Sequence, residues 1–126
     1  MKLLKSAVVA VSLALSLGSF STTAVACEDG RTCFGPMEAI NITLGHVAEA
    51  MKALNDGSTE QALVHIKAAQ SANKEINAND VVDRNRQRAN GSLKKAKSAL
   101  KKDDAAGATK HLEKAERGFE ALKGML

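Results

Sequence analysis

Aromatic side chains are scarce in this sequence, which has no tryptophan, no tyrosine and only three phenylalanines. Single-stranded nucleic acids bind to proteins by stacking their bases on aromatic side chains inside basic grooves. The most basic stretch of this chain, residues 84–102, contains no aromatic residue on which a base could stack. We therefore expect no nucleic-acid partner, and the export predicted below supports the same conclusion.

The sequence also lacks the short motifs that mark common enzyme classes. It contains no glycine-rich phosphate loop, no G-x-S-x-G turn and no H-E-x-x-H zinc motif. Its acidic residues are scattered along the expected helix surfaces instead of forming a pair. A cysteine nucleophile would need a positioned base, and both cysteines lie in an N-terminal leader that positions poorly. The sequence therefore predicts a non-catalytic protein.

The first 26 residues have the three parts of a secretory signal peptide. Lys2 and Lys5 form a positive start, residues 7–17 are apolar, and residues 24–26 read Ala-Val-Ala, a typical cleavage site. The apolar run is too short to span a bilayer, and no other stretch could do so. We expect cleavage after Ala26 and a periplasmic or secreted protein.

Cysteine occurs only twice, at Cys27 and Cys33. After export, both would be in a compartment where disulfides persist, so a disulfide within the leader, residues 27–36, is one interpretation. A second is a lipoprotein anchored by acylation of Cys27, because Ala24-Val-Ala-Cys27 is a degenerate lipobox. A third is a metal site that uses both thiolates, although two ligands alone do not close a zinc site.

Charge is unevenly distributed along the chain. Residues 27–83 carry nine acids and four bases, whereas residues 84–126 carry twelve bases and five acids. This asymmetry can mark an anionic partner, such as phospholipid, lipopolysaccharide or an acidic protein of the envelope. Alternatively, the basic half packs beside the acidic half and its excess charge is solvated. The basic residues in question are Arg84, Arg86, Arg88, Lys94, Lys95, Lys97, Lys101 and Lys102.

A segment of eight residues occurs twice, about 46 residues apart. Residues 62–69 read Ala-Leu-Val-His-Ile-Lys-Ala-Ala, and residues 108–115 read Ala-Thr-Lys-His-Leu-Glu-Lys-Ala. The similarity extends outward in the same register, which indicates that one helical hairpin occurs twice. The further pairs are Gly45 with Gly91, Val47 with Leu93, Ala50 with Ala96, Ala53 with Ala99, Leu54 with Leu100 and Ile76 with Leu122.

Four amphipathic helices are predicted, over residues 37–54, 59–76, 81–102 and 103–124. Their apolar residues recur every three or four positions, as in bundle helices. Joined by short loops, they predict an all-α fold: an up-down-up-down antiparallel four-helix bundle built from a duplicated helical hairpin. Two helix starts have capping signals, Ser58 with Gln61 in a capping box and Asp103-Asp104. The expected core positions are Met37, Ile40, Leu44, Val47, Met51 and Leu54; Ala62, Ile66, Ala69, Asn73 and Ile76; Val82, Asn85, Ala89, Leu93, Ala96 and Leu100; Ala105, Ala108, Leu112, Ala115, Phe119 and Leu122.

The three histidines are the candidate metal ligands. In heptad terms His65 and His111 border the core, either near each other or on equivalent edges of the bundle, and His46 falls on the outer face with Glu49 one turn away. Neutral imidazole is a common ligand of zinc, copper and nickel. One interpretation is a weak metal site with His65 and His111 at its centre and His46 as an accessory ligand. The other is that His65 and His111 are ordinary amphipathic edge residues inherited with the repeat.

Two short runs resemble the small metal-binding protein family. They are Gly45-His46-Val47-Ala48-Glu49-Ala50 and Ala108-Thr109-Lys110-His111-Leu112-Glu113-Lys114. That family consists of exported, alanine-rich four-helix bundles with a duplicated hairpin, and its recurring histidines bind divalent metals such as copper. The resemblance implies the same fold and divalent-metal binding here. This chain differs in that it has only three histidines, whereas the family is rich in them.

A weaker resemblance connects the chain with the periplasmic b-type cytochromes, which are also four-helix bundles. The run Met37-Glu-Ala-Ile-Asn41 is similar to the segment that supplies their axial methionine. Their second haem ligand is a histidine near the end of the last helix. Here residues 119–126 contain no histidine, and no C-x-x-C-H motif is present. Haem is therefore not expected, and Met37 is interpreted as the first core residue.

Overall fold

The structure is a computed structural model of the full chain, and it describes Val25–Ala26 and residues 32–126. Residues 1–24 of the expected signal peptide and Cys27 lie outside these residues. The chain divides into two units, Met1–Thr32 and Cys33–Leu126. Strand β1 (Val25–Ala26) pairs with strand β2 (Thr32–Cys33) in a two-stranded sheet. Everything that follows concerns the second unit.

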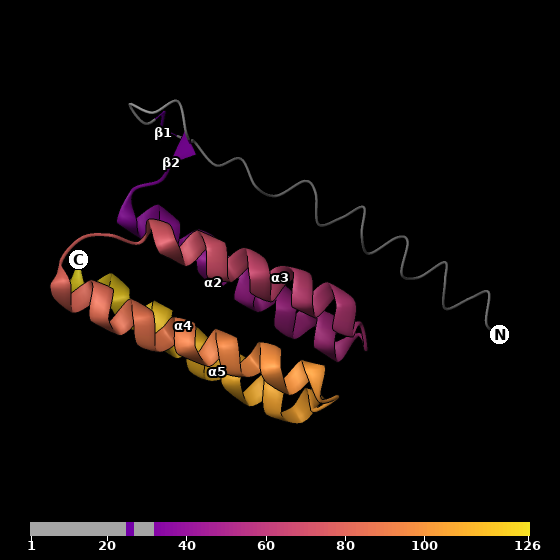
Figure 1. Ribbon diagram of the computed structural model, residues 1–126. Helices are drawn as coiled ribbons and strands as arrows, with labels where there is room; N and C mark the ends of the chain where they lie inside the picture. Colours follow the sequence, from indigo (N-terminus) through magenta and orange to yellow (C-terminus); the bar gives the residue numbers. More distant parts are fainter. Residues whose placement is uncertain (1–24, 27–31) are drawn as a thin grey trace. The chain divides into compact units, whose positions relative to one another are not determined.

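This second unit is all-helical, as the sequence predicts (Figure 1). Helix α2 spans Pro36–Asn55, α3 spans Thr59–Ala72, α4 spans Asp80–Lys101 and α5 spans Ala105–Leu122. The 3-10 turns η1 (Asn73–Glu75) and η2 (Lys123–Met125) extend α3 and α5. These bounds agree with the predicted helices to within a few residues. None of the described helices is both long enough and apolar enough to cross a lipid bilayer.

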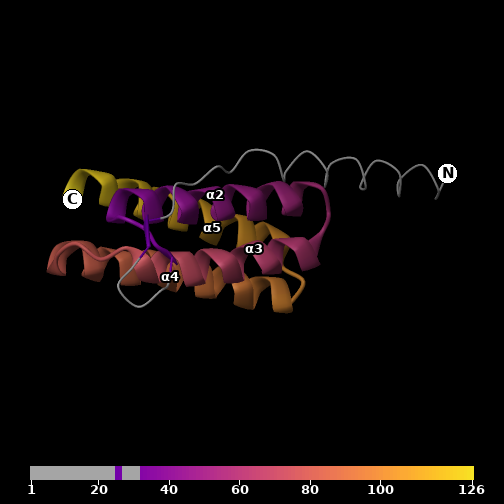
Figure 2. The same ribbon diagram turned by 90° about the horizontal axis from the view of Figure 1, so that it is seen from above.

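The two helices of each hairpin pack against each other most extensively. Helix α2 lies along α3 and α4 lies along α5, and smaller contacts join α2 to α5 and α3 to α4 (Figures 1 and 2). Helices α4 and α5 approach each other closely at Gly118, where an added Cβ atom would lie 2.9 Å from Cβ of Ala89. This approach leaves no room for a side chain at residue 118.

The core follows the predicted positions closely in α3, α4 and α5. All five positions predicted for residues 59–76 are fully buried. In the last two helices only Asn85, which is half-buried, and Ala105, which is exposed, depart from the expected stripes. The prediction of these three apolar stripes is therefore largely confirmed.

The predicted stripe of α2 is confirmed only in part. Ile40 and Val47 are fully buried as expected, but Met37 is 44% exposed, and the buried face is shifted toward Ala39, Thr43 and Ala50. The Thr43 hydroxyl donates to the Ala39 carbonyl at 2.8 Å, so its burial leaves no unpaired donor. The larger residues that were expected at the centre lie half-buried at the edges of the core, namely Leu44, Met51 and Leu54.

Helix ends follow the capping signals in part. Asp104 caps α5 as expected, because its Oδ1 accepts from the Gly107 amide at 2.9 Å. Ser58 stands at the N-cap of α3 but makes no side-chain hydrogen bond there, so the expected capping box is not formed. The turn before it uses Gly57 at φ 77°, in the left-handed region that favours glycine.

Candidate functional site

Two of the three histidines meet between helices α2 and α3. The imidazole rings of His46 and His65 are stacked with centroids 6.1 Å apart and planes inclined by 30°. Both side chains are half-buried. We call these two residues the His pair. It is the only pair of aromatic rings recorded in contact among the residues that the structure describes.

The shift of the buried face of α2 explains why His46 belongs to the His pair. A buried face that runs through Ala39, Thr43 and Ala50 includes position 46 at its edge, because these positions are three or four residues apart. On α3, His65 precedes the fully buried Ile66 and lies one turn before the fully buried Ala69. The expectation that His46 lies on the outer face is therefore wrong.

Burial and charge both act on His46. Partial burial lowers the pKa of His46 below its ordinary value of 6.5, and the neighbouring His65 lowers it further, whereas Glu49 raises it. The reason is that a second positive charge close by and a reduced contact with water both disfavour the imidazolium form. At neutral pH His46 is therefore a neutral ring with a nitrogen lone pair available to a metal ion.

His111 occupies a different place. It lines a hollow between α4 and α5 together with Lys94, Lys95 and Lys102. The structure thus brings His65 together with His46, the residue expected to be accessory, and not with His111. Of the two placements that the sequence left open, His111 takes the one away from His65, on the second hairpin.

A third protein ligand is not in place at the His pair. Among Val25–Ala26 and residues 32–126, no three His, Cys, Asp or Glu side chains gather closely enough to hold a metal ion. Glu49, half-buried on the next turn of α2, is the acid whose charge reaches His46. The expected disulfide or metal role of Cys27 and Cys33 involves one residue outside the described part of the chain.

The basic residues predicted to meet an anion divide into two groups. Arg86 and Lys97 are half-buried, and the other six are exposed. Arg86 is occupied by internal contacts, because its guanidinium donates to Asp83 at 2.6 Å and to Oδ1 of Asn73 at 3.1 Å. The hydrogen bonds from Arg86 lower the pKa of Asp83. The exposed set consists of Arg84, Arg88, Lys94, Lys95, Lys101 and Lys102.

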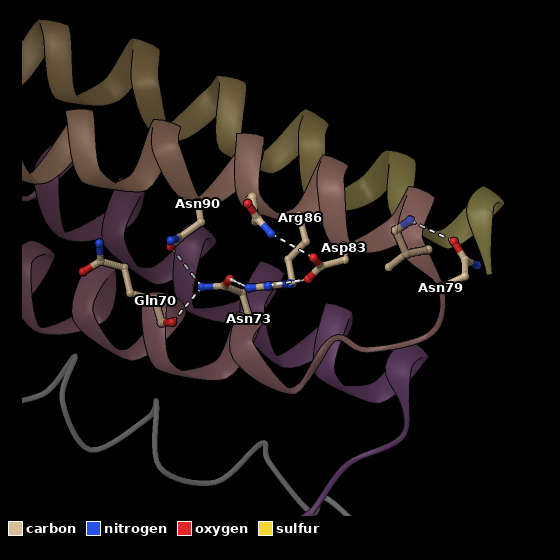
Figure 3. A network of polar contacts seen from close by, with 8 residues as sticks. Gln70, Asn73, Asn79, Asp83, Arg86 and Asn90 are labelled. Carbon is tan, nitrogen blue, oxygen red and sulfur yellow. Dashed lines mark hydrogen bonds and ion pairs between the residues drawn. The ribbon is translucent and has the colours of Figure 1, made fainter.

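Asn73 is a structural residue whose partners the sequence analysis missed (Figure 3). It is fully buried, and its Nδ2 donates to the Ala69 and Gln70 carbonyls and, at 3.1 Å, to Oδ1 of Asn90 on α4. With Arg86 it joins the end of α3 to α4. The sequence did contain one sign of such a network, an asparagine at a predicted core position, because a buried amide requires hydrogen-bond partners.

Comparison with known proteins adds no family assignment. The chain matches no protein-family model, and no curated protein has significant sequence similarity to it. The function must therefore be argued from the residues described above.

Proposed function

We propose that this protein is an exported, non-catalytic helical protein that weakly binds a divalent transition metal, copper, zinc or nickel, through His46 and His65. The observation that carries the proposal is the contact of the two imidazole rings between α2 and α3. Membership of the small metal-binding protein family is part of the same proposal. Haem is not, since residues 119–126 contain no histidine.

The rings lie close to the spacing that a shared ion requires. A zinc–nitrogen bond of about 2.0–2.1 Å places each ring centroid about 3.2 Å from the metal, so two ligands at a tetrahedral angle have centroids about 5.2 Å apart. The observed separation is 6.1 Å, so the rings would approach each other by about 1 Å when the ion binds. Rotation of the two side chains about χ1 and χ2 would bring one nitrogen of each ring toward the ion.

We include Glu49 in the proposed ligand set as a third ligand that would move to the ion when it binds. It lies three residues after His46, a spacing that places both side chains on one helix face. Two imidazoles and one carboxylate leave a coordination position for water, and such a set suits zinc, copper or nickel.

The finer description of the fold belongs to this proposal as well. We infer an up-down-up-down antiparallel bundle of two copies of one hairpin. Supporting it, residues at equivalent positions are fully buried in both copies, and each hairpin packs most closely within itself. The equivalent buried pairs are Val47 with Leu93, Ala50 with Ala96, Ala62 with Ala108, Ile66 with Leu112, Ala69 with Ala115 and Ile76 with Leu122.

Export rests on the sequence of residues 1–26. Lys2, Lys5 and the Ala-Val-Ala run before Cys27 support cleavage after Ala26 and a periplasmic location. In that compartment Cys27 and Cys33 would form a disulfide. The intact mass of the exported protein tests this directly, because cleavage, a disulfide and acylation each give a different mass.

Calorimetric titration with Cu(II), Zn(II) and Ni(II) tests the metal site. We expect His46→Ala and His65→Ala each to weaken binding strongly, and the control His111→Ala to bind like the wild type. Binding should also weaken in acid, because protons compete with the metal for imidazole nitrogens. Equal, negligible heats for the wild type and all three variants would refute the proposal. Loss only in His111→Ala would refute the assignment of the ligands.

A second candidate function is docking on an anionic component of the envelope, phospholipid, lipopolysaccharide or an acidic protein, by the basic residues of α4. The exposure of six of these side chains favours it. We expect binding to anionic vesicles that weakens steeply with salt, because exposed charges are screened within about 8–10 Å at physiological ionic strength. Failure to bind at low salt would count against it.

A further inference from the structure

Two hollows line the boundary between α4 and α5, and we call them together the α4–α5 groove. The first, of about 370 Å³, is lined by Lys94, Lys95, Lys102 and His111. The second, of about 210 Å³, is lined by Arg88 and Lys114 among mainly small or apolar neighbours. The groove therefore gathers basic side chains from both helices, whereas the sequence directed attention to α4 alone.

Acidic side chains are almost excluded from the groove. Among the residues lining the two hollows, Asp104 is the single acid. Its Oδ1 accepts from the Gly107 amide, so its charge is held at the N-terminus of α5. The glutamates of α5 are exposed and line neither hollow, and their spacing of three to four residues places them on another face. They are Glu113, Glu116 and Glu120.

The same boundary in the first hairpin has the opposite chemistry. With the offset of about 46 residues, Glu49 corresponds to Lys95 and His46 to Ser92, while His65 corresponds to His111. The first hairpin thus carries two imidazoles and a carboxylate, which suit a cation. The second carries one imidazole among lysines, which repel a metal ion and attract an anion.

We propose that the α4–α5 groove binds a phosphate group, with Lys95 and Lys102 as its principal ligands and Lys94 and His111 beside them. Lysine binds phosphate as a point charge through three donors on a flexible stem. The proposal rests on the second candidate function, in which the basic residues of α4 bind an anion. It specifies that the anion is a phosphate group and that it binds in the α4–α5 groove. The phosphate comes from a soluble compound or from a lipid headgroup.

Two probes separate these sources. Inorganic pyrophosphate titrated into isotope-labelled protein should shift the backbone amide signals of Lys95, Ser98 and Lys102. Vesicles that contain phosphatidylglycerol should sediment with the protein if a headgroup also fits. Binding of pyrophosphate alone assigns a soluble phosphate, and binding of the vesicles assigns a headgroup.

Matched variants decide whether the groove or the overall charge binds. The groove variant Lys95→Glu/Lys102→Glu and the control Arg84→Glu/Lys101→Glu change the net charge equally, and all four side chains are exposed. Only the first pair lines the α4–α5 groove. A basic residue near an anionic surface strengthens binding about fivefold, so we expect the groove variant to bind at least about 25-fold more weakly and the control to lose much less. Circular dichroism would verify that both variants keep their helices.

Two outcomes would overturn the proposal in different ways. Equal losses in the groove variant and the control would refute the groove site and leave general charge-driven docking in place. No binding of either probe by the wild type at low salt would refute the groove and the second candidate function together.

Discussion

The hydrogen bonds of Asn73 should contribute a large part of the stability at the α3–α4 boundary. Asn73→Ala removes two contacts with α4, the one to Asn90 and the one from Arg86, each 3.1 Å long. A neutral hydrogen bond contributes about 1 kcal/mol, and one with a charged partner contributes about 1.5–3 kcal/mol. Arg86 keeps its ion pair with Asp83, which limits the loss. We therefore expect the free energy of unfolding to fall by about 2–3 kcal/mol.

Urea unfolding followed by circular dichroism measures this change, and a double-mutant cycle isolates its source. Asn73→Ala, Arg86→Ala and the double variant should give a coupling energy of about 1–2 kcal/mol, within the range for residues in one network. Asn85→Ala is the matched control, because its Nδ2 donates only to the Val81 carbonyl of the same helix, in a hydrogen bond exposed to solvent. The reasoning fails if the coupling energy is close to zero and Asn73→Ala is as stable as the control.

Two further perturbations test the His pair and the close approach of α4 and α5. Folding lowers the pKa of His46, so the folded state binds this proton less readily than the unfolded state. The contribution of His46 to the free energy of unfolding should therefore be fully present above pH 6.5 and be lost as the pH drops through the folded pKa. Urea midpoints between about pH 7 and pH 5 should fall less in His46→Gln than in the wild type, and equal slopes would contradict this. Gly118→Ala should destabilise by about 1–3 kcal/mol through overpacking against Ala89, whereas the control Gly91→Ala, with open space around its Cβ, should stabilise by up to about 1 kcal/mol. Indistinguishable thermal midpoints for the two glycine variants would count against the close contact.

The sequence predicts the helices well because apolar periodicity depends on local spacing. Ile66 and Leu112 belong to clear stripes and are fully buried. The centre of the buried face of α2 is harder to predict, because several of its faces carry apolar residues. Ile40 and Val47 are buried as expected, but the face is shifted away from Met37 toward Ala39 and Ala50, whose small side chains suit close helix contact.

The same shift of the buried face limited the prediction of the candidate site. The heptad pattern placed His46 on the outer face of the helix, so it could not predict the contact of His46 with His65. The partners of Asn73 escaped prediction for a different reason. A sequence shows that a core amide needs hydrogen bonds but does not show that Arg86 and Asn90 of another helix supply them.

Each proposed ligand zone lies inside one hairpin, with the His pair between α2 and α3 and the groove between α4 and α5. Energetic coupling between two sites requires an element with two arrangements that both ligands bias. Because each set of ligating side chains lies within one hairpin, movement of one hairpin against the other does not change the distances within either set. We therefore expect a metal ion and a phosphate to bind independently, so that saturation with one leaves the affinity for the other nearly unchanged.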